Sequence, residues 1–254
     1  MLKTQRQEQL IRILEKDGIM RISDLATILD SSMMTIRRDL DSLEKTGVVK
    51  RIHGGVILSQ RTDGLQPTFY ERVEEFKDEK DKIGAEAASR INPGDIIFFD
   101  AGTTTLAIVK HIPDNLEFTA ITNGLLTAVA LASKPNINLI EIGGNIHKTS
   151  FSVVNYMAVE MIRKFHGNKA FISTKAFDLP YGTFEAQMSL IEVKKAMVES
   201  SEEIILLADY SKFNSKSLTH AIKIDDIDEI ISNVNLQEGI LENLRKLPIK
   251  ITLV

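Results

Sequence analysis

The chain of 254 residues contains no cysteine and no long apolar run. Without cysteine it can form neither a disulfide framework nor a thiolate metal site, and it has no thiol nucleophile. A helix that spans a bilayer needs about 18 or more consecutive apolar residues, so we expect no contact with a membrane. The first residues, Met-Leu-Lys-Thr-Gln-Arg-Gln-Glu, lack the apolar core of a signal peptide, which favours a cytoplasmic location.

Signatures of common catalytic and metal sites are also missing. The sequence has neither a Gly-x-Ser-x-Gly nucleophile elbow nor a Gly-Lys-Ser/Thr phosphate loop. No two of its histidines stand three or four residues apart, so they do not form the convergent set that a metal ion requires. We therefore expect no metal and no cofactor. The five histidines are His53, His111, His147, His166 and His220.

The charge of the chain is small but unevenly distributed. The whole chain has 31 basic and 35 acidic side chains and a formal net charge of −4, which argues against a protein that coats nucleic acid along its length. Residues 1–57 carry ten Lys and Arg against eight Asp and Glu, a net charge of +2, which leaves 21 against 27, or −6, for the remainder. The sign of this difference suits a nucleic-acid-binding head on an acidic body.

The stretch from Ser32 to Gly47 has the pattern of a helix with one buried face. Ser32 is a good N-cap, and Gly47 favours the left-handed conformation that ends a helix. The apolar residues at i, i+4 and i+7 are Ile36, Leu40 and Leu43, and the side chains that point away from them are Met34, Arg38 and Asp41. Guanidinium and hydroxyl groups near the start of a helix suit a DNA major groove, although an ordinary solvated helix fits this segment equally well.

The segments around this helix predict a winged helix-turn-helix domain at residues 1–57. Helices are expected from the capping box Thr4–Gln7 to Gly18 and from the cap Ser23 through Leu29, with a short apolar piece at residues 19–22 between them. Beyond Gly47, a basic β-type run with a glycine pair predicts a hairpin, or wing. The expected partner is double-stranded operator DNA, contacted by Ser32, Met34, Thr35, Arg37, Arg38, Lys50, Arg51 and His53.

A polar linker at residues 58–74, with Gly64 and Pro67, precedes a larger body at residues 75–254. Near-continuous apolar strands that alternate with helices predict a Rossmann-like, mainly parallel α/β domain covered on both faces. Strands are expected at 96–99, 118–121, 137–142, 170–173, 204–208, 230–231 and 249–253. Helices are expected through Ile83, Ala87 and Ile91 and at 104–112, 124–133, 153–165, 188–200 and 236–245.

Glycines and polar side chains follow four of the predicted strands. Because the carboxyl ends of parallel strands meet at one edge of a sheet, these residues are expected to share a ligand site. Hydroxyls and free N–H groups at a helix start suit a phosphate, as does a lysine. Ordinary turn chemistry explains any one segment, but four on one edge favour a small anionic ligand. The residues are Asp100, Gly102, Thr103, Thr104, Thr105, Thr122, Asn123, Gly143, Gly144, Asp209 and Lys212.

Both regions resemble the DeoR family of bacterial transcriptional regulators. The head matches in Thr35-Ile-Arg-Arg-Asp-Leu40, Leu43-Glu44, Gly47 and Arg51-Ile-His-Gly-Gly55. The body matches in Phe69–Arg72, Glu79-Lys80, Asp100–Thr104, Thr122-Asn123, Gly143-Gly144, Phe171-Ile172, Gly182, Lys194, Asp209 and Lys212-Phe213. The resemblance implies a winged helix-turn-helix head and a sensor domain related in fold to ribose-5-phosphate isomerase, with a phosphorylated sugar or related metabolite as effector.

The chain also departs from the family pattern. Ser31 stands where an apolar residue usually packs the turn. Residues 173–178 replace a glycine-spaced loop, and there Lys175 adds a cation to the expected effector site while Phe177 adds bulk. Asn155 and Leu190 stand where glycine and glutamate are frequent. These departures leave the identity of the effector open.

We interpret the sequence as a transcriptional regulator, a repressor of a carbohydrate-utilisation operon relieved by a phosphorylated sugar. A homodimer or homotetramer is expected, because paired half-sites need two heads. One alternative is an isomerase-like enzyme with Asp100, Asp178 or Asp209 as base and Lys175 or Lys212 as electrophile, although a fused DNA-binding head speaks against turnover. Another is a protein-interaction module that uses the last helix, through Leu236, Ile240, Leu241 and Leu244.

Overall fold

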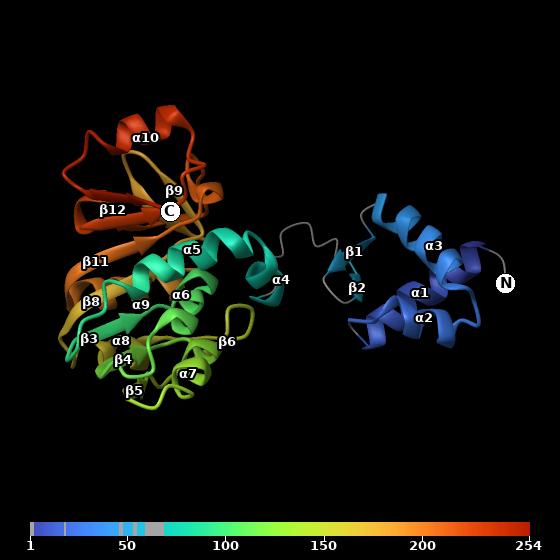
Figure 1. The fold of residues 1–254 in the computed structure, drawn as a ribbon, viewed down its shortest axis with the longest axis horizontal. Helices are drawn as coiled ribbons and strands as arrows, with labels where there is room; N and C mark the ends of the chain where they lie inside the picture. Colours follow the sequence, from blue (N-terminus) through green and yellow to red (C-terminus); the bar gives the residue numbers. More distant parts are fainter. Residues whose placement is uncertain (1–2, 18, 46–47, 53–54, 59–68) are drawn as a thin grey trace. The chain divides into compact units, whose positions relative to one another are not determined.

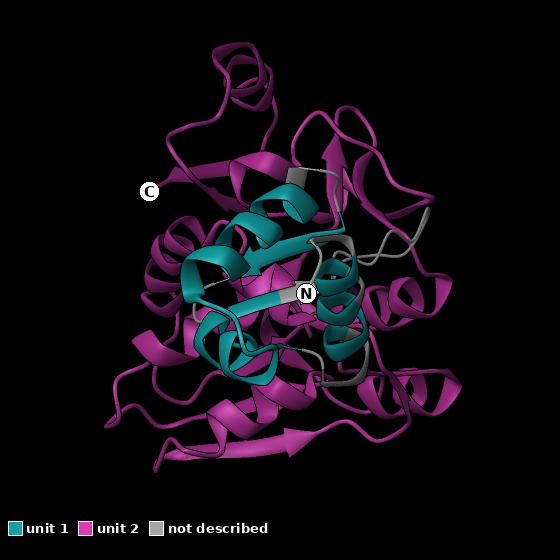
Figure 2. Ribbon diagram, turned by 90° about the vertical axis from the view of Figure 1, so that its right-hand side faces the viewer, with its two compact units in different colours: residues 1–65 teal, residues 66–254 magenta. Residues whose placement is uncertain are grey.

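The computed structural model describes residues 3–17, 19–45, 48–52, 55–58 and 69–254. It divides into two compact units, residues 1–65 and residues 66–254, each with its own colour in Figure 2. The predicted linker, residues 58–74, spans this division. Its last part forms the helix α4 (Phe69–Glu74), which belongs to the second unit.

The first unit has the expected order of a winged helix-turn-helix domain (Figure 1). Its elements are α1 (Lys3–Asp17), α2 (Ile22–Ile28), α3 (Met33–Lys45), β1 (Val49–Ile52) and β2 (Gly55–Leu58). The strands β1 and β2 pair in antiparallel register and form the wing. The predicted apolar stripe of the third helix is buried, and it packs with residues of α1, α2 and the wing, among them Leu10, Leu14, Leu25, Leu29, Val49 and Val56.

Three details of the first unit differ from the predictions. The helix α1 begins at Lys3, before the predicted capping box, so that Thr4 lies within the helix, and the N-cap position of α2 is Arg21 rather than Ser23. The apolar piece before α2 is not a strand, because only Met20 pairs, with Val56 of the wing. Ile28, which the helical pattern placed among the apolar residues of α2, is 55% exposed.

The second unit is built on a seven-stranded sheet in which every neighbouring pair is parallel, as the apolar runs predicted. The strand order is β14-β13-β11-β8-β3-β4-β5. The bounds are β3 (Ile96–Phe99), β4 (Phe118–Thr122), β5 (Ile137–Glu141), β8 (Gly167–Ser173), β11 (Ser201–Leu207), β13 (Glu229–Ser232) and β14 (Lys250–Leu253). From β3 the chain continues to one side and then returns to the other, so the strand order reverses between β3 and β8.

Helices cover both faces of this sheet (Figure 1). One face packs against α5 (Lys77–Ala88), α6 (Thr103–Ile108), the turn η1 (Val109–His111) and α7 (Leu125–Leu131). The other packs against α8 (Tyr156–Ile162), α9 (Met188–Glu199) and α10 (Glu238–Leu244). Along β3, Ile97 and Phe99 belong to the first layer and Phe98 to the second, which explains why these strands read as unbroken apolar runs.

Five short strands were not predicted. β6 (Asn145–His147) and β7 (Ser152–Val154) form an antiparallel hairpin, so the helix expected from residue 153 begins at Tyr156 instead. β9 (Ala176–Asp178), β10 (Gly182–Glu185) and β12 (Thr219–Lys223) form a separate antiparallel sheet. Two further 3-10 turns are η2 (Tyr210–Lys212) and η3 (Ile224–Asp226). None of the helices in the described part of the chain is both long and apolar enough to cross a membrane.

Candidate functional site

The outer surface of α3 presents the predicted head residues to solvent. The Ser32 hydroxyl accepts a hydrogen bond from the backbone N–H of Thr35 at 3.2 Å and so caps the helix, as expected. Arg37 and Arg38 are exposed one turn later, and neither side chain has an ion-pair partner among the described residues. Met34 is also exposed. The start of α3 therefore offers two free guanidinium groups beside an apolar side chain.

Arg51 of the wing is bound to α3. Its Nη2 lies 2.5 Å from Oδ1 of Asp41 and donates to the backbone oxygen of Arg37 at 3.0 Å, while its Nε lies 3.7 Å from Glu44. The sequence placed Arg51 on the DNA backbone, whereas in the structure it holds the wing against the helix and offsets the charge of Asp41. Lys50 is exposed, and His53 lies outside the described residues.

A buried ion pair fixes α3 against α1. Asp39 is buried, and one of its carboxylate oxygens lies 2.5 Å from Nε of Arg6. Gln7 adds a hydrogen bond of 3.4 Å to the backbone oxygen of Asp39. Asp39 therefore stabilises the packing of α3 on α1. The neighbouring Arg37 and Arg38 remain available to a partner.

In the second unit, Asp100 lies where the strand order reverses. Asp100 follows β3, and its Oδ2 accepts hydrogen bonds from the backbone N–H and the hydroxyl of Ser173 at 3.1 and 2.5 Å, and from Nζ of Lys194 at 2.5 Å. Lys194 also lies 3.4 Å from Glu185. Burial alone would lower the pKa of Lys194, but these carboxylates raise it above its ordinary value. The four residues form a buried polar network that ties β3, β8 and α9 together.

Gly102 permits this close approach of β3 and β8. A Cβ atom at position 102 would lie 1.9 Å from the Ser173 hydroxyl and 3.2 Å from the hydroxyl of Thr105. The glycine is therefore needed for packing at the reversal point. The same geometry shows that the Thr105 hydroxyl faces this point, and it is buried without a hydrogen-bond partner among the described residues.

The segment after β4 is held mainly by internal contacts. The Thr122 hydroxyl donates to the backbone oxygen of Phe99 at 2.7 Å and accepts from the N–H of Gly124 at 3.0 Å. Asn123 donates to the backbone oxygen of Val153 at 3.1 Å, and its Oδ1 is buried with no hydrogen-bond partner in the described structure. Thr122 therefore serves the fold, while the oxygen of Asn123 is available to a ligand.

Four cations gather around this end of the sheet. The pKa of Lys80, a residue of α5, is lowered from 10.5 to about 8, mainly by burial; Asp209 and Glu75 raise it, and the charges of Lys212 and Arg72 add to the lowering. Burial, followed by the charges of Lys212 and Arg72, also lowers the pKa of Lys175. Burial lowers the pKa of the Arg72 guanidinium as well. We call Arg72, Lys80, Lys175 and Lys212 the cation cluster.

Contacts of these side chains place them around the strand ends. Lys212 Nζ lies 3.5 Å from Oδ2 of Asp209, two residues after the end of β11, and 5.7 Å from the ring centre of Phe76. Lys80 donates to the backbone oxygens of Arg72 and of Glu75, the latter at 2.5 Å. Asp209 is fully buried, and its Oδ2 has no hydrogen-bond donor in the described residues apart from this long ion pair. Besides Asp209, the carboxylates of Glu75 and Glu185 act on members of the cluster and raise their pKa values, so cations and carboxylates are mixed at this end of the sheet.

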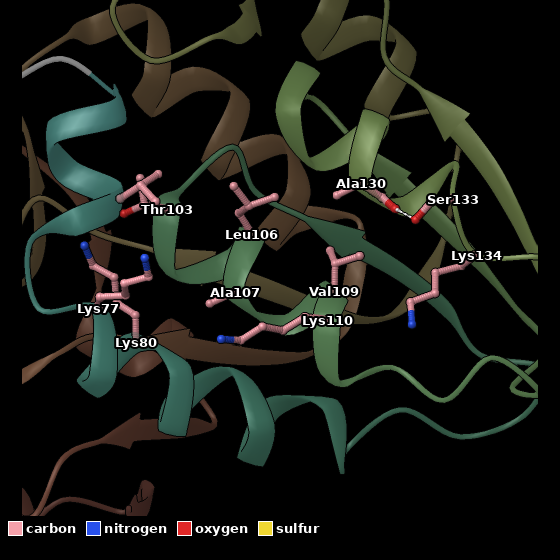
Figure 3. A pocket seen from close by; sticks show the side chains of 11 residues that line it. Lys77, Lys80, Thr103, Leu106, Ala107, Val109, Lys110, Ala130, Ser133 and Lys134 are labelled. Atoms are coloured by element: carbon pink, nitrogen blue, oxygen red, sulfur yellow. Dashed lines mark hydrogen bonds between the residues drawn. The ribbon is translucent and has the colours of Figure 1, made fainter. Parts of the chain in front are cut away.

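Not every predicted effector residue joins this cluster. Gly143 and Gly144 are exposed beside the β6–β7 hairpin, and Thr104 is buried in α6. Thr103 instead lines a pocket of about 480 Å³ over the helical layer, between α5, α6 and α7 (Figure 3). Its floor is apolar, and its lysines other than Lys80 are paired: Lys77 with Glu74, Lys110 with Asp81 and Lys134 with Asp114. Lys80 thus lines this pocket and also belongs to the cation cluster, whereas the other three lysines of the pocket each have a carboxylate partner.

Arg72, Lys80 and Lys194 matched the family pattern but were not assigned to the site. A signal for Lys80 was present, because it stands in line with Ile83 and Ala87 at i, i+3 and i+7 on the apolar face of α5. A lysine within an apolar stripe is either paired or functional. Lys194 shows the same pattern between the buried Ile191 and Met197 of α9. No group of three potential metal ligands occurs within the described ranges.

Two family models match most of the chain. The DeoR-like helix-turn-helix domain matches residues 6–62, and the DeoR C terminal sensor domain matches residues 75–234. An uncharacterized HTH-type transcriptional regulator of Bacillus subtilis is 34% identical over 254 residues, which covers 100% of this chain and 98% of the relative. A putative aga operon transcriptional repressor of Escherichia coli O157:H7 is 31% identical over 252 residues, or 99% and 94% of the two chains.

Among solved structures, ribose 5-phosphate isomerase A of Methanocaldococcus jannaschii is similar with a TM-score of 0.41 and 15% identity, over 54% of this chain and 55% of that one. Both family models and the relatives named above are regulators, so the isomerase interpretation is not supported. The chain, with a DNA-binding head and a sensor body, belongs to the DeoR family of transcriptional regulators.

Proposed function

We propose that the protein represses a carbohydrate-utilisation operon and that a small phosphorylated sugar, bound at the cation cluster, releases it from its operator. One relative is a putative aga operon transcriptional repressor, which supports repression rather than activation. The cation cluster is the observation that indicates an anionic ligand. Burial lowers the pKa values of Arg72, Lys80 and Lys175, and repulsion by neighbouring cations adds to the lowering for the two lysines, so the cluster favours a bound anion.

A phosphate suits this arrangement better than a single carboxylate. Its oxygens can bind a guanidinium bidentately and accept from several lysines at once. Bound there, the phosphate would restore the charged form of each lysine that burial disfavours. Because Arg72, Lys175 and Lys212 come from three different elements, the phosphate would also connect α4, the end of β8 and the turn after β11.

Buried polar atoms next to the cluster suit the rest of a sugar. Oδ2 of Asp209, the hydroxyl of Thr105 and Oδ1 of Asn123 are buried without hydrogen-bond partners among the described residues. A buried polar atom left without a partner costs about 1–3 kcal/mol, so such atoms normally have one. Hydroxyl groups of a sugar would supply those partners.

Helix α4 is suited to carry the signal, because it is the first described segment after the head and contains Arg72 of the cluster. The rings of Phe69 and Tyr70 pack against Phe151 of the β6–β7 hairpin, with centres 5.9 and 5.8 Å apart. Two residues after α4, Phe76 packs on Tyr210 at 5.4 Å between ring centres and lies 5.7 Å from Nζ of Lys212. A ligand that moves Arg72 or Lys212 therefore acts on α4, and would favour one conformation of the protein over another.

A thermal-shift screen against phosphorylated sugars and their unphosphorylated forms tests the ligand class, since a ligand that binds the folded state raises its apparent stability. The best ligand is then added to a complex with an operator duplex. Lys212→Met and Lys175→Met should still bind the duplex but fail to release it. Lys223→Met, which removes an exposed lysine of β12, is the control. Release at unchanged ligand concentration in both cluster variants would disprove the proposed site.

We propose that the protein acts as a dimer or tetramer. One head presents a single reading helix, and operators of such proteins usually contain two half-sites about one helical turn or a multiple apart. Sedimentation of the free chain and footprinting of its operator test this: a monomer on a single half-site would contradict it.

A further inference from the structure

Two methionines at the start of α3 project into solvent. Met33 is 52% and Met34 is 62% exposed. Methionine is usually buried, where its flexible thioether fills gaps in a core. The core of the first unit uses the opposite side of this helix, through Ile36, Leu40 and Leu43. The pair, which we call the apolar tip, therefore does not stabilise the fold by burial.

The backbone that carries the apolar tip is fixed. Ser32 caps the first turn through its bonds to Thr35, and the ion pair between Asp39 and Arg6 holds the next turn against α1. Met34 lies on the same stripe as Arg38, one turn earlier in the helix. The exposed guanidinium group of Arg38 lies on this stripe and that of Arg37 lies next to it, so both can reach DNA together with the apolar tip.

The family of this chain binds DNA, and in helix-turn-helix proteins the first residues of the second helix meet base edges in the major groove. Most groups on these edges are hydrogen-bond donors or acceptors, with which a thioether interacts weakly. The one large apolar group in the major groove is the 5-methyl group of thymine. We infer that the apolar tip reads thymine methyl groups, so that each half-site contains a thymine beside the position contacted by Arg37 or Arg38.

This inference rests on operator binding by α3. The experiment tests operator binding and the reading of thymine methyl groups separately. Full-length protein selects duplexes from a random-sequence pool, and the recovered sites are aligned. We expect a fixed thymine in each half-site. Replacing it by deoxyuridine removes only the methyl group, and should weaken binding about fourfold, the ratio that corresponds to about 0.8 kcal/mol for one buried carbon.

Two variants test whether the methionines of the apolar tip are the residues that contact the thymine methyl group. Met34→Gln keeps the length and helix propensity of the side chain but makes it polar, and Met33→Gln does the same next to it. At least one of them should bind the thymine and uracil duplexes equally. Ile28→Gln is the matched control, because it replaces another exposed apolar residue of the same unit and should keep the fourfold difference.

Three results would overturn the inference while leaving operator binding intact: selected sites without a fixed thymine, equal binding of thymine and uracil duplexes by the unmodified protein, or an undiminished difference in both methionine variants. Recovery of no specific duplex would instead overturn operator reading as a whole. Circular dichroism of each variant, expected to be unchanged because both methionines are exposed, excludes loss of folding as the cause.

Discussion

Nζ of Lys194 lies 2.5 Å from Oδ2 of Asp100, at the place where the strand order of the sheet reverses. Both side chains are buried, and the same amine donates to the backbone oxygen of Ser173 at 2.7 Å. The pair therefore closes the gap between β3 and β8 that open α/β sheets usually offer to a ligand. Three donors occupy Oδ2 of Asp100, so this oxygen stabilises the fold at the reversal point, while the role of Asp100 as an effector ligand stays a prediction.

Replacing Lys194 by Met should destabilise the second unit strongly. The substitution leaves the carboxylates of Asp100 and Glu185 buried without their cation, a loss that typically costs about 3–5 kcal/mol. Urea unfolding monitored by circular dichroism measures the change. Lys195→Met, at the next and exposed position of α9, should change stability by less than about 0.5 kcal/mol. Equal effects of the two substitutions would show that the buried network adds no stability.

Stability should rise with pH where Lys80 titrates. Its pKa is about 8 in the folded protein and 10.5 when the chain is unfolded, so between these values the unfolded state binds more protons. Folding therefore carries a cost, of order 3 kcal/mol, that is fully present below about pH 8 and disappears as the pH rises to 10.5. Urea midpoints of the unmodified protein, relative to Lys80→Met, should increase from about pH 7 to about pH 10. A constant difference would contradict the lowered pKa.

Arg51 should support DNA binding by offsetting Asp41 rather than by touching a phosphate. If so, Arg51→Ala weakens operator binding in the unmodified protein but has little effect once Asp41 is also Ala, because no carboxylate then faces the DNA. The measurement is a double-mutant cycle by gel shift across salt concentrations. If Arg51→Ala lowers affinity equally in both backgrounds and reduces the salt slope by about one, Arg51 contacts a phosphate directly.

Arg38→Ala should weaken binding to a selected operator duplex by about 1–3 kcal/mol if the guanidinium reads a base. The loss should depend on the base pair at one position, because a phosphate contact carries no sequence information. Arg12→Ala, which removes an exposed arginine of α1, serves as the control in the same titration. Unchanged affinity for Arg38→Ala would exclude the residue from the interface.

The main elements were predictable because their patterns are strong and local. The strand Ile96–Phe99 was predicted to the residue, since four apolar residues between Asp95 and Asp100 allow little else. The stripe of Ile36, Leu40 and Leu43 likewise follows from helical periodicity alone. In both cases the neighbours in sequence determine which face is buried.

The rest depends on contacts between distant segments. The β6–β7 hairpin has strands of three residues, too short for a periodic signal, and it is held by bonds such as that from Val153 to Asn123. The sequence shows that Arg51 is basic but not that Asp41, ten residues away, neutralises it. Arg72 and Lys80 reach the effector site from helices that precede the sheet, whereas the prediction considered only residues that follow strands.

The apolar core of the head contains only residues from positions 10–56, and the two cores of the body contain only residues from position 83 onward. On the roles we propose, substitutions at Met34 or Arg38 change the target sequence without altering the cores of the body. Substitutions at Lys175 or Lys212 change the response to the effector without altering the core of the head. The two properties can be inherited and altered separately. A chain built this way can acquire a new signal for an old target gene, or a new target gene for an old signal, by mutation of one unit alone.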